Sequence, residues 1–194
     1  MNHPEGKGIL VVEAWISAQA VGESARVFDP KRYQYLVVVG GPMVEPDTKA
    51  PNPPTYADRA FGDLVKVGFD MSKVVKISVP YQKARRTFAN AMAVRDWLAL
   101  SGLSTRDVDV FTLGVHARKS WILFRHALGN HYRVGIIAGS ETSYSPTRWL
   151  VSRRGRWVVA RNLMGYLYTQ FWVSLDTMAP FKVLSAELYF PTPE

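Results

Sequence analysis

The sequence predicts an α/β domain with a mostly parallel sheet of about five strands flanked by helices. Two observations support this prediction. Short runs rich in Val, Ile and Leu alternate along the chain with longer stretches of helical periodicity, a pattern typical of βαβ units. Most of the short runs are almost continuously apolar, as expected of parallel strands that helices cover on both faces.

The expected strands are the β-branched runs Gly8–Glu13, Tyr35–Val39, Val74–Val79, Val108–Leu113 and Val134–Ala138. The expected helices between them are Ala18–Phe28, Tyr56–Val67, Thr87–Leu100 and Ala117–Leu128. In the last helix, Trp121, Phe124 and Leu128 fall at i, i+3 and i+7, so one helix face can pack on a sheet. The loop over 42–54 has five prolines and follows the second strand, so it can act as a lid over the carboxyl edge of the sheet.

The chain changes character after Ala138. Ser145 and Pro146 form a good helix start, because serine can cap a helix and proline fits its first position. We expect a helix from there to about Trp172, with a potential break at Gly155. Beyond it, Val183–Phe190 is either a last strand or a packed tail.

Length and composition indicate a single domain over 1–194, with its core at about 8–140 and a carboxyl-terminal helix and tail at about 145–194. The absence of cysteine excludes disulfides, thiolate catalysis and zinc–thiolate sites. The first eight residues lack the features of a secretory signal, and no stretch has the roughly 20 apolar residues that span a bilayer. We expect a cytoplasmic protein, with peripheral membrane association as the alternative.

Positive charge is concentrated between Ala117 and Arg161. This segment has nine lysines and arginines against one acid, Glu141, while the rest of the sequence is balanced. A localised positive field attracts phosphate-bearing partners, whether nucleotide, nucleic acid or anionic lipid. The arginines at 153, 154 and 156 precede an aromatic stripe at helical spacing, which fits an anionic membrane surface or, by the interpretation that we favour, a helix packed on the core.

A histidine-basic cluster opens the helix that begins near Ala117. His116, Arg118 and Lys119 follow the apolar run ending at Leu113, so they are expected at the carboxyl end of a strand. In open α/β sheets ligands bind outside those ends, and the free N–H groups of a helix start favour an anion. We therefore interpret Arg118 and Lys119 as ligand-binding residues and His116 as the best catalytic candidate.

Two further strand ends carry candidate residues. Gly40 and Gly41 permit positive φ and a close approach of ligand to backbone, or simply make a tight turn. Glu13 can bind a ribose hydroxyl or a metal, act as a base, or pair with Arg85 or Lys119.

The start of the third helix is the last candidate. Thr87 and Asn90, preceded by Arg86, can hold phosphate through hydrogen bonds and the helix dipole, or can be a capped helix with solvated charges. No histidine has the i, i+4 spacing of a metal pair with His116, and no nucleophilic serine motif occurs, so we predict neither a metal site nor a covalent intermediate. Nothing in the sequence identifies a cofactor.

Four motifs follow one another along the chain: Leu10-Val-Val-Glu13, Val38-Val-Gly-Gly41, Arg86-Thr-Phe-Ala-Asn-Ala91 and His116-Ala-Arg-Lys119. In their order they resemble the YdcF-like family of envelope-associated domains, and the resemblance covers roughly 8–140. The resemblance implies a Rossmann-like, three-layer fold with a polar pocket and a link to cell-envelope or lipid-carrier metabolism. Arg86, Ala89 and Lys119 replace the family's asparagine, glutamate and arginine, so the ligand can differ.

Three classes of function remain. The first, which we favour, is binding or turnover of a phosphate-bearing small molecule, nucleotide-like or lipid-pyrophosphate, at the sheet edge. The second is a peripheral membrane or envelope-assembly factor that docks through the basic aromatic helix without catalysis. Nucleic-acid binding is favoured only by the pI of about 9.8, since neither a helix-turn-helix nor an RNP-type strand is evident. The sequence leaves open whether a reaction is catalysed and what the oligomeric state is.

Overall fold

The computed structural model describes residues 2–46, 51–141 and 144–178. Its five strands form one all-parallel sheet with the order β3-β2-β1-β4-β5. The strands are β1 (Gly8–Glu13), β2 (Tyr33–Gly40), β3 (Val74–Ser78), β4 (Asp107–Leu113) and β5 (Arg133–Gly139). The predicted α/β class is confirmed, and the topology is that of a Rossmann-like fold.

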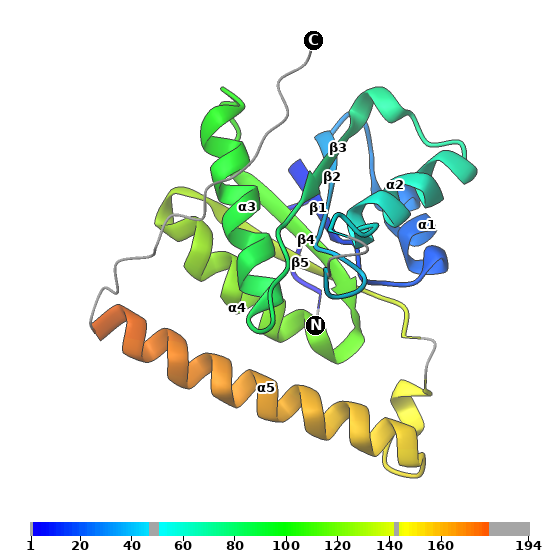
Figure 1. Ribbon diagram of the computed structural model, residues 1–194, viewed down its shortest axis with the longest axis vertical. Helices are drawn as coiled ribbons and strands as arrows, with labels where there is room; N and C mark the ends of the chain where they lie inside the picture. The colour runs from blue at the N-terminus through cyan, green and yellow to red at the C-terminus, as the bar shows by residue number, and fades with distance from the viewer. Residues whose placement is uncertain (1, 47–50, 142–143, 179–194) are drawn as a thin grey trace.

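Helices cover both faces of the sheet, which makes three layers (Figure 1). The helices α1 (Ala18–Val27) and α2 (Tyr56–Lys66) lie on one face, and α3 (Arg86–Leu100) and α4 (Ala117–Leu128) lie on the other. The long helix α5 (Arg153–Met178) runs along the outside of α4. Four short 3₁₀ turns join these elements: η1 (Met71–Lys73), η2 (Gly114–His116), η3 (Gly129–His131) and η4 (Pro146–Arg148).

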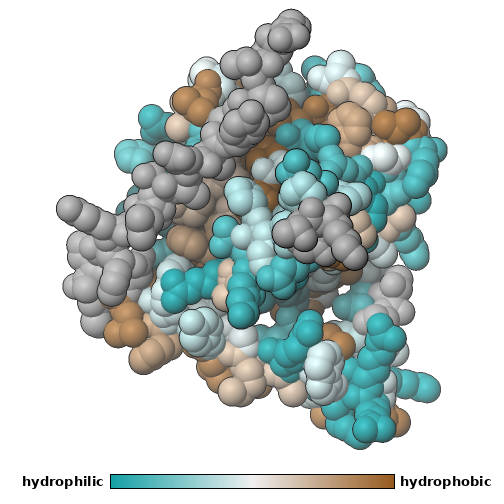
Figure 2. All heavy atoms as spheres, in the orientation of Figure 1, coloured by the Kyte–Doolittle hydropathy of each residue, from teal (hydrophilic) through white to brown (hydrophobic). Residues whose placement is uncertain are grey.

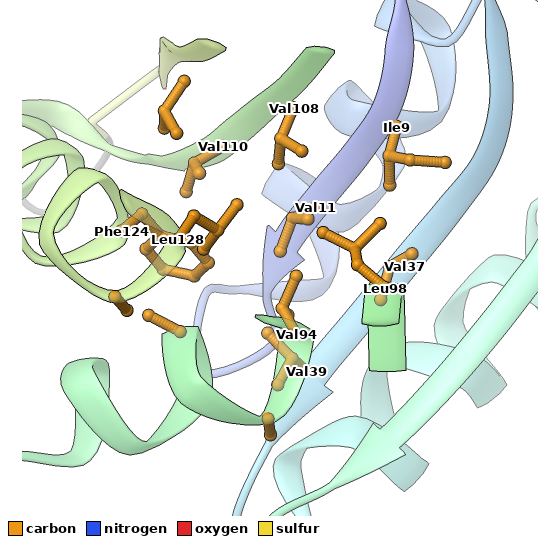
Figure 3. Packing of buried hydrophobic residues seen from close by; sticks show 14 of the residues in the cluster. Ile9, Val11, Val37, Val39, Val94, Leu98, Val108, Val110, Phe124 and Leu128 are labelled. Atoms are coloured by element: carbon orange, nitrogen blue, oxygen red, sulfur yellow. The ribbon is translucent and has the colours of Figure 1, made fainter. Parts of the chain in front are cut away.

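The core consists of two apolar clusters, one on each face of the sheet. Successive side chains of a strand point to opposite faces, so Ile9 and Val11 of β1 belong to one cluster and Leu10 and Val12 to the other. Figure 3 shows the first cluster, in which strand residues meet Val94 and Leu98 of α3 and Phe124 and Leu128 of α4. This two-sided burial explains why the strands are almost continuously apolar.

A buried carboxylate attaches the amino-terminal segment to the sheet. Asp109, in the middle of β4, is fully buried and accepts three hydrogen bonds: from the N–H of Glu5 at 2.7 Å, from the N–H of Gly6 at 2.8 Å and from Tyr33 Oη at 2.7 Å. Burial, together with the hydrogen bond to Asp109, raises the pKa of Tyr33. A Cβ at Gly135 would overlap the Asp109 carboxylate, so glycine is required there.

The carboxyl-terminal helix differs from its prediction in where it begins. Ser145 and Pro146 introduce only the 3₁₀ turn η4, and α5 begins at Arg153. Gly155 does not break α5; a Cβ there would come within 2.6 Å of the Trp149 carbonyl oxygen, so glycine serves close packing. The predicted segment Val183–Phe190 lies outside the described residues.

The prediction that the aromatic stripe of α5 packs on the core was largely wrong. Trp157, Met164, Tyr168 and Phe171 are 59% to 67% exposed, and Trp172 is the stripe's aromatic residue that packs on the body, against Phe88 and His126. The helix instead approaches α4 with smaller side chains. A Cβ at Gly165 would lie 3.7 Å from Lys119 Cδ, and Thr169 is buried.

Candidate functional site

A cavity of about 670 Å³ lies where the carboxyl ends of four adjacent strands meet the starts of α3 and α4 and the inner side of α5. Trp15 follows β1, Gly40 ends β2, Val79 follows β3 and His116 follows β4, and all four line it. Figure 2 shows hydrophilic side chains gathered over the amino-terminal end of α3, with the surface hollowed between them and α5. The sheet edge predicted to bind a ligand is therefore the edge that carries a cavity.

The amino terminus of α3 forms one wall of the cavity. Arg85 precedes the helix with φ of 55°, a left-handed conformation that costs free energy in a residue other than glycine, and no side chain caps the helix. Thr87 and Asn90 line the cavity as predicted. Asn90 is 7% exposed, and its side-chain amide has no hydrogen-bond partner among the described residues. The helix start thus presents uncapped N–H groups and a free amide to the cavity.

Four cations line the cavity, and no described lining residue is acidic. Arg85 stacks on Trp172 at 4.5 Å and Arg161 on Trp157 at 4.7 Å, while Arg86 donates to the Gln82 carbonyl oxygen at 3.1 Å. Lys119 is partly buried. Burial, reinforced by the charge of Arg161, lowers the pKa of Lys119 although Glu13 acts in the opposite direction. None of the four forms an ion pair with a described carboxylate.

His116 is held by α5. Its Nδ1 lies 3.1 Å from Oδ1 of Asn162, whose Nδ2 donates to the Val158 carbonyl oxygen at 2.9 Å. The second bond orients the amide, so Nδ1 of His116 carries the hydrogen and donates it. In the neutral ring, Nε2 is then the unprotonated nitrogen. Trp15 meets the ring edge-on at 4.9 Å.

Glu13 lies behind His116. It is fully buried, Ser120 Oγ donates to its Oε2 at 2.5 Å, and this oxygen is 3.9 Å from His116 Nε2. Both His116 Nε2 and Glu13 Oε1 are buried without a hydrogen-bond partner among the described residues. Burial lowers the pKa of His116, and the charge of Glu13 opposes this effect.

The expected roles of Glu13 change accordingly. The side chain does not line the cavity, so it is not placed to bind a ribose hydroxyl there. Arg85 lies over Trp172, and no ion pair joins Glu13 to Lys119 within the described residues. Glu13 instead acts on the cavity indirectly, through its charge on His116 and Lys119.

Gly40 and Gly41 line the cavity, but neither has positive φ. A Cβ at Gly40 would lie 2.9 Å from Tyr56 Cβ, and one at Gly41 would lie 3.1 Å from the Val79 carbonyl oxygen. Close packing of α2 and β3 against the end of β2 therefore accounts for both glycines. The proline-rich loop after them is closed at its base by a bridge between Pro42 and Thr55, and its residues 47–50 lie outside the described residues.

Arg118 does not reach the cavity. Its guanidinium lies 4.9 Å from the Tyr166 ring and lines a separate groove between α4 and α5. On a helix, adjacent residues point about 100° apart, which separates Arg118 from Lys119. Of the nine predicted site residues, the structure places Gly40, Gly41, Arg86, Thr87, Asn90, His116 and Lys119 around one cavity.

Sequence reasoning missed Ser120, Asn162, Arg161 and the aromatic side chains of the cavity. Ser120 had a usable signal, because it is a polar residue four positions after His116 on the buried side of an amphipathic helix. No sequence signal pointed to Asn162. It lies on α5, which is separated from α4 by β5 and a long loop, and it contacts His116 only through tertiary packing.

Acidification is expected to destabilise the protein through His116. Because burial lowers the folded-state pKa of His116 below its ordinary value of 6.5, the unfolded chain binds more protons at acid pH. The stabilising contribution is therefore present above about pH 6.5 and is lost as the pH falls through the folded-state pKa. Urea unfolding at pH 7.5 and pH 5 should show a larger loss for wild type than for His116→Gln, and equal losses would contradict the burial argument.

The sequence was compared with models of protein families and with curated proteins, and it matches none of them. In the described residues, no helix is long and apolar enough to cross a membrane. Within the same part of the chain, histidines and carboxylates form no group of three that could hold a metal ion.

Proposed function

We propose that the protein binds a phosphate-bearing small molecule, nucleotide-like or lipid-pyrophosphate, in the cavity at the carboxyl edge of its sheet. The observation that carries this proposal is the composition of the cavity wall. Four cations and an uncapped helix amino terminus face the cavity, and no described acidic residue lines it. Phosphate oxygens accept hydrogen bonds from all of these groups.

The electrostatics of Lys119 support an anionic ligand. Burial disfavours the charged form of this side chain, and Arg161 adds repulsion. An anion beside Lys119 would oppose both effects, since an opposite charge within about 4–6 Å favours the charged form. A phosphate group beside Lys119 would therefore favour the charged form of this side chain.

The topology supports a ligand at this position. The strand order reverses direction between β1 and β4. The strands β2 and β3 are added on one side of β1, and the next strands, β4 and β5, are added on its other side. Ligands of open α/β sheets bind in the crevice at such a switch point. Trp15 and His116, which follow the two strands at the switch, both line the cavity.

The remaining wall is aromatic and apolar, and it includes Tyr56, Phe88, Leu123, Tyr168 and Trp172. The cavity volume of about 670 Å³ is within the range typical of small-molecule sites. The cavity therefore suits a ligand that joins a phosphate or pyrophosphate group to a planar or apolar part.

Turnover is the further step of the proposal, and His116 is its candidate catalytic residue. With Nδ1 donating to Asn162, the unprotonated Nε2 is buried and faces Glu13 Oε2 at 3.9 Å, so proton exchange with a ligand would require a movement that exposes this nitrogen to the cavity. In the described cavity wall, His116 is the side chain with an ordinary pKa near neutrality. Release of inorganic phosphate from bound compounds, measured for wild type and His116→Gln, separates binding from turnover.

Kinship with the YdcF-like family is part of the proposal and would add a role in cell-envelope metabolism. Its support is the position of the four motifs. The motif Leu10–Glu13 ends β1, Val38–Gly41 spans the end of β2, and the other two open α3 and α4. All four thus meet at the cavity or directly behind it.

A thermal-shift titration tests the proposal. The compounds are pyrophosphate, AMP, a uridine diphosphate sugar and geranyl pyrophosphate, with S-adenosylmethionine as a ligand without phosphate. At roughly a hundred times Kd, a bound compound should raise the Tm by about 5 °C or more. His116→Ala should weaken this shift, and His131→Ala, an exposed histidine outside the cavity, should not.

Two results would contradict the proposal. One is the absence of a shift with every phosphate compound. The other is a shift that His116→Ala and His131→Ala reduce equally, since that would place the ligand elsewhere.

A further inference from the structure

The side of α5 that faces away from the body carries an apolar stripe. We define the outer stripe as Trp157, Leu163, Met164, Leu167, Phe171 and Leu175. Each of its side chains is 49% to 67% exposed. Met164, Leu167, Phe171 and Leu175 follow one another at spacings of three and four residues, so they form one continuous face of the helix.

The outer stripe does not hold α5 in place. The helix contacts the body through Asn162, Gly165, Thr169 and Trp172, which recur at the same spacing on the opposite side. An exposed apolar stripe of this length is unusual on a soluble monomer and marks an interaction surface. Among the described residues, the outer stripe is thus left exposed to a partner, while the inner side of α5 forms the cavity wall.

Charge at one end of the outer stripe indicates the kind of partner. Arg153, Arg154 and Arg156 are all exposed at the start of α5. The whole of α5 has four arginines and one acidic residue, Asp176, near its carboxyl end. A second copy of α5 would therefore bring one carboxylate to a cluster of three arginines, whereas an anionic lipid surface complements all three.

We propose that α5 docks on an anionic lipid surface, with the outer stripe at the headgroup boundary and the three arginines on lipid phosphates. Trp, Phe and Leu on one face, with arginines beside them, are typical of helices that lie in the plane of a membrane interface. Apolar burial and attraction to anionic lipid act together in such helices. This surface is separate from the cavity, so the proposal goes beyond ligand binding.

Co-sedimentation of the full chain with vesicles tests the proposal. One set of vesicles contains phosphatidylglycerol mixed with phosphatidylcholine, and the other contains phosphatidylcholine alone. The variants are Leu167→Ser with Phe171→Ser, and Arg153→Gln with Arg154→Gln and Arg156→Gln. The matched controls change exposed residues outside α5: Val65→Ser with Leu100→Ser, and Arg26→Gln with Lys31→Gln and Arg106→Gln.

The wild-type protein should bind the anionic vesicles and bind the neutral vesicles far less. Added salt should dissociate it from the anionic vesicles. The triple arginine variant should bind about a hundredfold more weakly, because each cation near an anionic surface contributes about 1 kcal/mol. The double serine variant should bind at least about tenfold more weakly. Both control variants should bind like wild type.

Three results would overturn the proposal. The first is wild type that binds neither set of vesicles at low salt. The second is α5 variants that bind as wild type does, with thermal unfolding showing that they are folded. The third is a wild-type protein that binds no vesicles and is a dimer in light scattering, where the serine substitutions dissociate the dimer. That result would make the outer stripe a self-association surface.

Discussion

Replacing Asp109 by alanine is expected to lower the free energy of unfolding by about 3 kcal/mol or more, since each buried donor left without its acceptor costs about 1–3 kcal/mol. Three donors would lose their acceptor: the N–H groups of Glu5 and Gly6 and the hydroxyl of Tyr33. The carboxylate is fully buried in the middle of the sheet, so water would not replace it easily. Urea denaturation of the full chain measures the loss.

Asp96→Ala is the control for this substitution. Asp96 pairs with Arg95 on the surface of α3, where both side chains are partly exposed, so its removal should change stability by less than about 0.5 kcal/mol. Equal effects at the two positions would show that the hydrogen bonds of Asp109 do not anchor the amino-terminal segment.

Lys119→Met is expected to weaken pyrophosphate binding about a hundredfold, because losing one partner of a buried charge pair costs roughly 2–5 kcal/mol. The free protein should not lose stability, since burial already disfavours the Lys119 charge. Binding and stability should thus respond differently to the same substitution. Calorimetric titration with pyrophosphate and urea unfolding measure the two quantities.

Arg118→Met is the matched control, because it removes the neighbouring cation on the same helix. Arg118 lies over Tyr166 and outside the cavity, so pyrophosphate affinity should change less than about threefold through long-range charge alone. If both substitutions weakened binding alike, the phosphate would not lie beside Lys119.

The fold could be predicted because its signals are local. An apolar run in the sequence indicates each strand. The helix α4 was predicted with its observed bounds, because Trp121, Phe124 and Leu128 define one apolar face within 12 residues. The sheet edge followed from topology, since parallel strands end on one side. That rule brought Gly40, Asn90 and His116 together in the prediction, and they line one cavity.

The parts that could not be predicted depend on packing between distant segments. Helical periodicity shows which residues of α5 share a face. Large side chains occur on both the inner and the outer face, so periodicity does not reveal which of them packs on the body. The face that turns inward carries the small residues Gly165 and Thr169, together with Asn162 and Trp172. The role of Glu13 was also hidden, because its burial behind His116 depends on Ser120 of α4.

The hydrogen bond between His116 and Asn162 joins the reactivity of the histidine to the position of a helix that is otherwise outside the three layers. Asn162 selects which ring nitrogen carries the hydrogen, and neighbouring positions of the same helix wall the cavity. A displacement of α5 would therefore open the cavity and release the imidazole in a single event. Because Nε2 is buried while α5 is in place, the position of one helix sets both the hydrogen bond at Nδ1 and the exposure of Nε2.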